Sequence, residues 1–192
     1  MIKVMGIDPG ISHLGGALIK VDTKTPAPFV LEYADSLRGD LTDYNVRPDT
    51  PSQPKAWGLV RSYGYLLEHL EPDIVCCEDN FLQLSPSSFK RLIEVVTMMC
   101  YCTANNLPDI PFHLVLPRLA KQIVDADKDK GDKTLVKEGL KKCPFLDLNG
   151  FDLDHLTEHA VDAVLLAVYE AVQLYKSYGW DVNNVRATDR AA

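Results

Sequence analysis

Three apolar segments joined by short connections open the chain and restrict the folds that it can adopt. They cover residues 2–8 ("IKVMGID"), 14–21 ("LGGALIKV") and 28–36 ("PFVLEYADS"). Each has the length of a strand and is bounded by Pro, Gly or Asp, which is typical of β-strands. Connections this short join strands that run in opposite directions, so the segments predict an antiparallel start to a sheet.

Helices and strands alternate after this meander. A Pro-rich loop at 37–54 is followed by apolar spacing that predicts a helix at 55–70, and "DIVCCE" (73–78) predicts a buried strand that ends in an acid. The same reasoning predicts a helix at 86–106, a strand at 112–116, two short helices at 117–125 and 132–142, and a long helix at 156–176.

This order of elements favours one α/β domain over residues 1–176. Three strands followed by helix–strand–helix–strand–helix give a five-stranded mixed sheet with helices on both faces, which is the ribonuclease-H-like architecture. The polar, aperiodic segment 177–192 predicts a flexible C-terminal tail.

The composition is that of an ordinary soluble globular protein, and we expect the chain to stay in the cytosol. The sequence contains no run of 18 or more apolar residues, and its first residues already resemble a strand, so we expect neither a membrane span nor a signal peptide. The five cysteines form no C-x-x-C pair, and four lie in apolar strand or helix patterns, which predicts reduced thiols. The net charge of −7 argues against a nonspecific nucleic-acid coat, although eight of the twenty Lys and Arg residues lie between Arg118 and Lys142.

Acidic residues and one histidine occupy the ends of the predicted elements. Asp8 ends the first strand, Glu78 ends the fourth, and the last helix opens with Glu158, His159 and Asp162. A spacing of three places His159 and Asp162 on one face of that helix. If strands one and four are neighbours, the two strand-end carboxylates meet at one edge of the core. Such oxygen and nitrogen ligands suit hard divalent cations, so the pattern predicts a metal site.

The same segments resemble the RuvC family of Holliday-junction resolvases, which are divalent-metal endonucleases with the ribonuclease-H-like fold. The likeness runs from Met1 to about Tyr175. Departures from the family pattern, among them the acidic stretch "DADKDKGD" (125–132) and a long Pro-rich loop, are similar to the phage-encoded branch, whose members cut a broader range of branched DNA. The matching segments are "GIDPGISHLGGALI" (6–19), "CCEDNF" (76–81), "PRLAKQIVDADKDKGDKTLVKEGL" (117–140) and "EHAVDAVLLAVYEA" (158–171).

The resemblance implies a set of metal ligands and a reaction. The ligands are Asp8, Glu78, His159 and Asp162, and the cofactor is Mg²⁺, for which Mn²⁺ substitutes, with two ions per active site. The reaction is phosphodiester hydrolysis between two metals about 4 Å apart.

The resemblance also implies DNA contacts. Lys121 and Lys133 match the family's phosphate-facing lysines, and Lys133 is also expected to be catalytic. Phe81 matches a position that stacks on a base at the branch point. From the same basic segment, Arg118 and Lys130 are expected to contact DNA.

The implied partners are branched DNA and a second copy of the chain. Four-way junctions are the expected substrates, with forks and flaps as further candidates, and a C2 homodimer would match a junction that is cut on two strands. No membrane partner is expected, and the compartment would be the cytoplasm of a bacterial host if a phage encodes the chain. Apolar residues in the helix at 86–106 are numerous enough for both a core and an interface: Val95, Val96, Met98, Met99 and Tyr101.

Other interpretations of the same residues stay open at this point. Asp8 in "DPG" can be a turn former, and Phe81 can belong to the core. A sugar-kinase-like ATPase also begins with a Gly-rich hairpin, but the sequence shows no second Gly-rich phosphate loop. A non-catalytic member of the same fold is a further alternative. An EF-hand at 125–136 is excluded, because Lys130 and Val136 stand where such a loop needs Gly and Glu.

Overall fold

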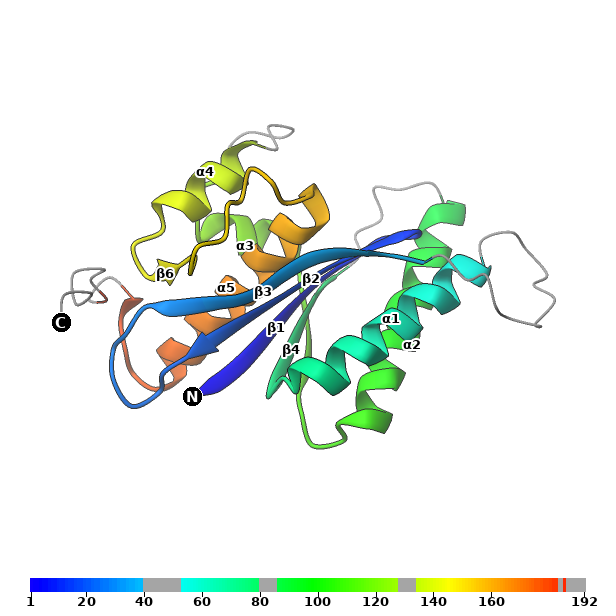
Figure 1. Ribbon diagram of the computed structural model, residues 1–192, viewed down its shortest axis with the longest axis horizontal. Helices are drawn as coiled ribbons and strands as arrows, with labels where there is room; N and C mark the ends of the chain where they lie inside the picture. The colour runs from blue at the N-terminus through cyan, green and yellow to red at the C-terminus, as the bar shows by residue number, and fades with distance from the viewer. Residues whose placement is uncertain (40–52, 80–85, 128–133, 183–184, 186–192) are drawn as a thin grey trace.

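A mixed six-stranded sheet forms the centre of the molecule. The computed structural model describes residues 1–39, 53–79, 86–127, 134–182 and 185 (Figure 1). The strands are β1 (Ile2–Pro9), β2 (His13–Val21), β3 (Phe29–Arg38), β4 (Ile74–Glu78), β5 (Phe112–Val115) and β6 (Leu146–Asp147). They lie in the order β5-β4-β1-β2-β3-β6. β1, β2 and β3 form the predicted antiparallel meander, whereas β4 runs parallel to β1 and to β5.

The sheet has one strand more than the five predicted. β6 is only two residues long and pairs in parallel with β3 at Phe29 and Val30. Two residues are too few to show an alternating pattern, so sequence periodicity does not detect such a strand.

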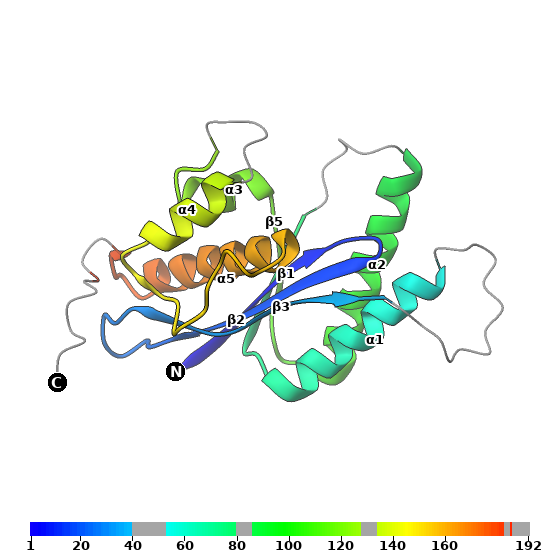
Figure 2. The same cartoon turned by 45° about the horizontal axis from the view of Figure 1, so that its top comes forward.

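Helices cover both faces of the sheet, as predicted (Figures 1 and 2). One face carries α1 (Gln53–Leu70) and α2 (Pro86–Asn106), and the other carries α3 (Pro117–Gln122), α4 (Thr134–Lys142) and α5 (Glu158–Ser177). The helix predicted at 117–125 ends at Gln122, three residues early. Asp125, the last residue of the predicted helix, has a positive φ of 56°, which is not helical. None of these described helices is long and apolar enough to cross a membrane.

Alternation along the strands divides the interior into two cores. On β1, Val4 packs into the core under α5, whereas Met5 and Ile7 pack against α1 and α2. On β4, Cys76 belongs to the α5 core and Cys77 to the other. Successive side chains of a strand point to opposite faces, so a sheet covered on both sides needs apolar residues at every position.

Helix α5 lies directly on the backbone of β1 and β2. A Cβ atom added at Gly6 would stand 2.0 Å from the carbonyl oxygen of Ala163, and one added at Gly15 would stand 1.9 Å from that of His159. Only glycine permits this approach. Alanines on the helix side, including Ala160 and Ala163, are fully buried in the contact. The glycines therefore determine how closely the start of α5 approaches the ends of β1 and β2.

The segment that follows α5 packs against the domain where the structure describes it. The Trp180 ring lies edge-on to Tyr175, with 5.1 Å between ring centroids, and Val185 is only 2% exposed. Residues 186–192 of the predicted tail lie outside the described residues. All five cysteines are free thiols, as predicted.

Candidate metal centre

Asp8 lies at the end of β1 on the face that α5 covers. It shares this face with Val4 and Gly6, because alternate residues of a strand point the same way. Its partner across the antiparallel ladder is Gly15. Asp8 is 8% exposed, so its carboxylate is nearly removed from water. A turn-forming aspartate would face solvent, whereas this one points to the interior beside α5.

Glu78 lies next to Asp8 at the end of the neighbouring strand. β1 and β4 are parallel, with Ile7 paired to Cys77. Asp8 and Glu78 are the next residues of the two strands, so both lie at the same end of the sheet. Glu78 is two residues after Cys76 and so lies on the same face of the sheet, the face on which Cys76 packs into the α5 core. The predicted meeting of the two strand-end carboxylates is therefore present in the structure.

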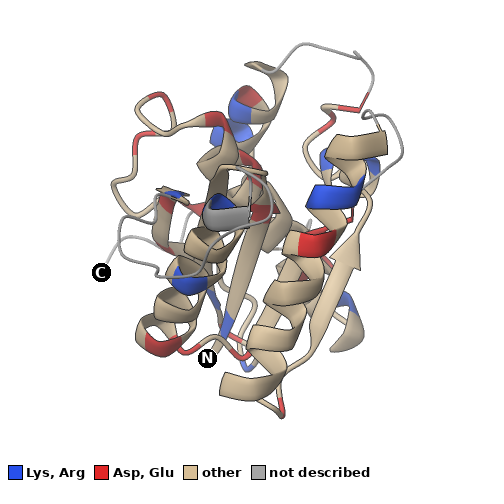
Figure 3. Cartoon of the chain, turned by 90° about the vertical axis from the view of Figure 1, so that its right-hand side faces the viewer, with Lys and Arg blue, Asp and Glu red and all other residues tan. Residues whose placement is uncertain are grey.

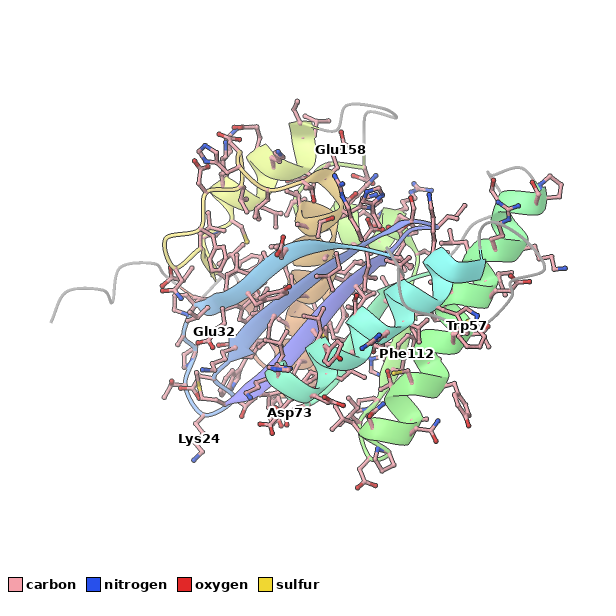
Figure 4. The ribbon with its side chains drawn as sticks, turned by 45° about the vertical axis from the view of Figure 1, so that its right-hand side comes forward. Lys24, Glu32, Trp57, Asp73, Phe112 and Glu158 are labelled. Atoms are coloured by element: carbon pink, nitrogen blue, oxygen red, sulfur yellow. The ribbon has the colours of Figure 1, made fainter. Side chains whose placement is uncertain are left out.

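The first turns of α5 supply His159 and Asp162. Thr157 caps the helix, its hydroxyl oxygen accepting a hydrogen bond from the Ala160 backbone amide at 3.2 Å. Figure 4 shows Glu158, the first residue of α5, at the end of the molecule opposite Lys24 and Asp73. The spacing of three places both His159 and Asp162 over the strand ends.

A hydrogen bond joins the two sides of this site. Nδ1 of His159 lies 2.5 Å from Oδ2 of Asp8. An ionised carboxylate can only accept, so Nδ1 carries the proton and donates it, and in the neutral imidazole the lone pair is then on Nε2. The bond raises the pKa of His159. Among the described residues, none makes a hydrogen bond to Nε2.

The crowded acids hold their protons unusually tightly. Burial, followed by the negative charges of Asp8 and Asp162, raises the pKa of Glu78 to about 8. Burial and the charge of Asp8 raise the pKa of Asp162 to about 6. Negative charges gathered in a partly dry region repel one another unless a cation compensates them. The site therefore carries uncompensated repulsion between carboxylates, which a bound cation would relieve.

Among the described residues, Lys121 on α3 is a basic residue that acts on these acids. Its charge lowers the pKa of both Glu78 and Asp162. Arg118, one turn earlier on α3, is exposed. The other predicted DNA contacts, Phe81, Lys130 and Lys133, lie outside the described residues. In the view of Figure 3, basic and acidic residues of the described chain are interspersed and form no separate basic or acidic face.

The donor chemistry suits a hard divalent cation, but the side chains are not arranged around one. Three carboxylates and an imidazole supply the oxygen and nitrogen ligands that Mg²⁺ and Mn²⁺ accept. Within the described ranges, however, no three His, Cys, Asp or Glu side chains converge in a geometry that could hold a metal ion. The Asp8–His159 hydrogen bond is part of this arrangement. The residues fit a metal in chemical type.

Sequence reasoning missed His13, the first residue of β2. Its imidazole stacks on that of His159, with 5.9 Å between ring centroids and 9° between ring planes. His13 has the parity of Gly15, and Gly15 lies against α5, so strand alternation was the available signal.

Comparisons with known proteins bear on the fold. No family model matches the chain, and neither does any curated protein. Among solved structures, RuvC of Thermus thermophilus matches with a TM-score of 0.67 at 18% identity, over 93% of this chain and 97% of that one. The yeast mitochondrial Holliday junction resolvase Ydc2 matches with a TM-score of 0.57 at 16% identity, over 91% of this chain and 82% of that one.

A viral protein has the same architecture. The fowlpox virus resolvase, solved with Holliday junction DNA, matches with a TM-score of 0.53 at 14% identity, over 90% of this chain and 99% of that one. Sequence identities this low support a shared fold and nothing more specific. The chain has the ribonuclease-H-like fold that RuvC and these two resolvases share, as its order of elements predicted.

Proposed function

We propose that this chain is a divalent-metal-dependent endonuclease that cuts branched DNA. The observation that carries the proposal is the meeting of Asp8, Glu78, His159 and Asp162 at one end of the sheet, where burial and mutual repulsion raise the pKa of two carboxyls. A purely structural cluster would pair these acids with nearby bases. Here the charges of Lys121 and of His159, when protonated, lower the pKa of Glu78, and they leave it at about 8.

Asp8, Glu78, His159 and Asp162 are the proposed ligands of Mg²⁺ or Mn²⁺, with two ions per site. When bound, such ions act as Lewis acids on a phosphodiester and lower the pKa of coordinated water. The protein's own contribution is orientation. Donation from Nδ1 to Asp8 holds His159 in the tautomer whose Nε2 is free to bind a cation, the arrangement that metal-ligating histidines commonly use.

Lys121 would contact the DNA phosphate next to the bond that is cut. Its charge already acts on Glu78 and Asp162, so it lies within electrostatic reach of the same region. Arg118, Lys130 and Lys133 would extend this contact along the backbone, with Lys133 also catalytic, and Phe81 would stack on a base at the branch point.

The proposed substrate is the four-way junction, and the proposed assembly is a homodimer. Similar folds have been solved with this DNA, namely RuvC with a Holliday junction substrate and the fowlpox resolvase with Holliday junction DNA. Exposed apolar side chains on α1 and α2 support an interface on the face opposite α5: Trp57, Tyr65, Ile93 and Tyr101. A two-fold axis would match two symmetric cuts.

Cleavage of a labelled four-way junction beside a linear duplex of matched sequence tests the function. The proposal predicts paired nicks near the branch with Mg²⁺ or Mn²⁺, no cutting with EDTA, and little cutting of the duplex. Cutting of flaps and forks as well would identify a broader debranching nuclease. DNA left uncut under every metal would contradict the proposal, and binding without cutting would then identify a non-catalytic member of the fold.

A further inference from the structure

We propose that His13 is a positioning residue that holds the imidazole of His159 in the orientation needed to bind metal. The inference rests on the proposed metal site, and it concerns a residue that the ligand set does not include. His13 begins β2 and lies on the face that α5 covers, in the same parity as Gly15.

The turn that carries His13 is anchored by its backbone. The amide of Gly10 donates to the His13 carbonyl at 2.8 Å, and the amide of Gly39 donates to the Ser12 carbonyl at 3.1 Å. His13 also pairs with Arg38 in the β2–β3 ladder. A residue held by turn and ladder bonds offers its side chain from a defined position.

The His13 ring is itself held in place by its neighbour. The Ser12 hydroxyl lies 3.0 Å from Nδ1 of His13. The ring then lies nearly parallel to His159, at 9° and with 5.9 Å between centroids, which is an offset stack.

Two contacts on different parts of the ring therefore constrain His159. Asp8 accepts from Nδ1, and His13 covers one face. His159 is still 41% exposed at its side chain, so packing alone does not immobilise it. Without the flat surface of His13, the ring could rotate about its bond to Asp8 and lose the orientation of Nε2.

Two substitutions separate the flat ring of His13 from its polar atoms. His13→Phe keeps an aromatic surface and lacks the bond to Ser12, whereas His13→Gln keeps a polar group and lacks the ring. His155→Ala is the matched control, since His155 is 86% exposed at its side chain and pairs with Asp152 rather than with the site.

The measurements are the calorimetric affinity for Mn²⁺ and, in the metal-free protein, the NMR shift of the His159 Cε1 proton. His13→Gln is expected to lose about tenfold in Mn²⁺ affinity, the scale known for residues that orient a metal ligand, and to shift this proton as the ring current disappears. His13→Phe is expected to keep the Mn²⁺ affinity within about twofold of the wild type and to keep a ring-current shift on the His159 proton. His155→Ala is expected to change neither the affinity nor the shift.

Each outcome separates this inference from the proposed function. Wild-type protein that binds no Mn²⁺ would overturn the proposed metal site itself. Mn²⁺ binding by wild type with equal affinity in His13→Gln would overturn only the positioning role. Equal losses in His13→Phe and His13→Gln would show that stacking is not what His13 contributes, and would also overturn it.

Discussion

Glu78 and Asp162 keep their protons to higher pH in the folded chain than in the unfolded one. Their pKa values rise to about 8 and about 6, chiefly through burial and secondly through the charge of Asp8. Between the unfolded and folded pKa of each acid, the folded state binds more protons, so stability falls as pH rises. The raised pKa of His159 acts in the same direction, because its stabilisation is present at low pH and is lost as pH rises through the folded value.

We therefore predict that Glu78→Gln stabilises the metal-free protein at pH 8. The change removes the ionisation that the fold opposes, so the melting temperature in EDTA should rise at pH 8 by at least about 2–4 °C, the change that 1 kcal/mol produces in a chain of this size. At pH 4.5 the variant and the wild type should melt together. Mn²⁺ should stabilise the wild type more at pH 8 than at pH 5. Parallel melting curves from pH 5 to pH 8 would show that Glu78 ionises normally.

Lys121 should contribute to DNA binding through its charge. Lys121→Gln should weaken junction binding and reduce the slope of log affinity against log salt by about 0.7–0.9, the value for one phosphate contact. Lys24→Gln is the matched control, because Lys24 lies at the end of the molecule opposite the start of α5 (Figure 4). Equal salt slopes for both variants, measured by fluorescence anisotropy, would remove Lys121 from the DNA contact.

At the scale of residues, the types of side chain at the site could be predicted from the sequence, but the contacts between them could not. Asp8, Glu78, His159 and Asp162 were identified by their positions at the ends of strands and the start of a helix. The Asp8–His159 bond and the His13 stack each join groups that the fold brings together from distant segments, and rotamers are not encoded in a local pattern. The roles of Phe81, Lys130 and Lys133 stay predictions.

Among the elements, the contact of α5 with β1 and β2 determines the site. We predict that Gly15→Ala abolishes cleavage and destabilises the fold by about 3 kcal/mol or more, since its Cβ would meet the His159 backbone at 1.9 Å. Gly16→Ala is the control on the opposite face. Its Cβ meets the end of the Leu66 side chain at 2.9 Å and the Tyr33 ring at 3.6 Å, but no backbone, and it should cost about 1 kcal/mol or less.

Chemical denaturation and junction cleavage of both variants check this prediction. Similar losses in the two would show that glycine is needed in β2 generally, and that α5 does not depend on the contact at Gly15.

Most elements could be predicted because their periodicity is strong. The meander, the buried strand β4 and the long helix α5 were found within about two residues of their observed bounds. The start of α5 at Glu158 rather than 156 follows from the Thr157 cap. β6 was missed because the fold, and not its two-residue sequence, pairs it with β3.

For the molecule as a whole, the apolar surface of α1 and α2 predicts self-association. Tyr101 on α2 is 73% exposed, and Trp57 and Ile93 are each 43% exposed. Light scattering after gel filtration should give a dimer, and Tyr101→Glu should shift it to a monomer because a charge would be buried without a partner. Tyr178→Glu, at an exposed tyrosine that follows α5, should leave the dimer intact. A wild-type monomer at micromolar concentration would contradict the proposed assembly.

The central claim is that the carboxylates at the ends of β1 and β4, with the start of α5, would hold a metal on which DNA cleavage depends. Asp8→Asn tests it most directly, because the change removes one ligand charge with almost no change in volume. The measurement is cleavage and binding of the same labelled four-way junction by wild type and variant in Mg²⁺. The account predicts that cleavage falls at least about 100-fold, or about 2.7 kcal/mol in the barrier, while binding survives. Cleavage at the wild-type rate, or loss of binding together with cleavage, would contradict it.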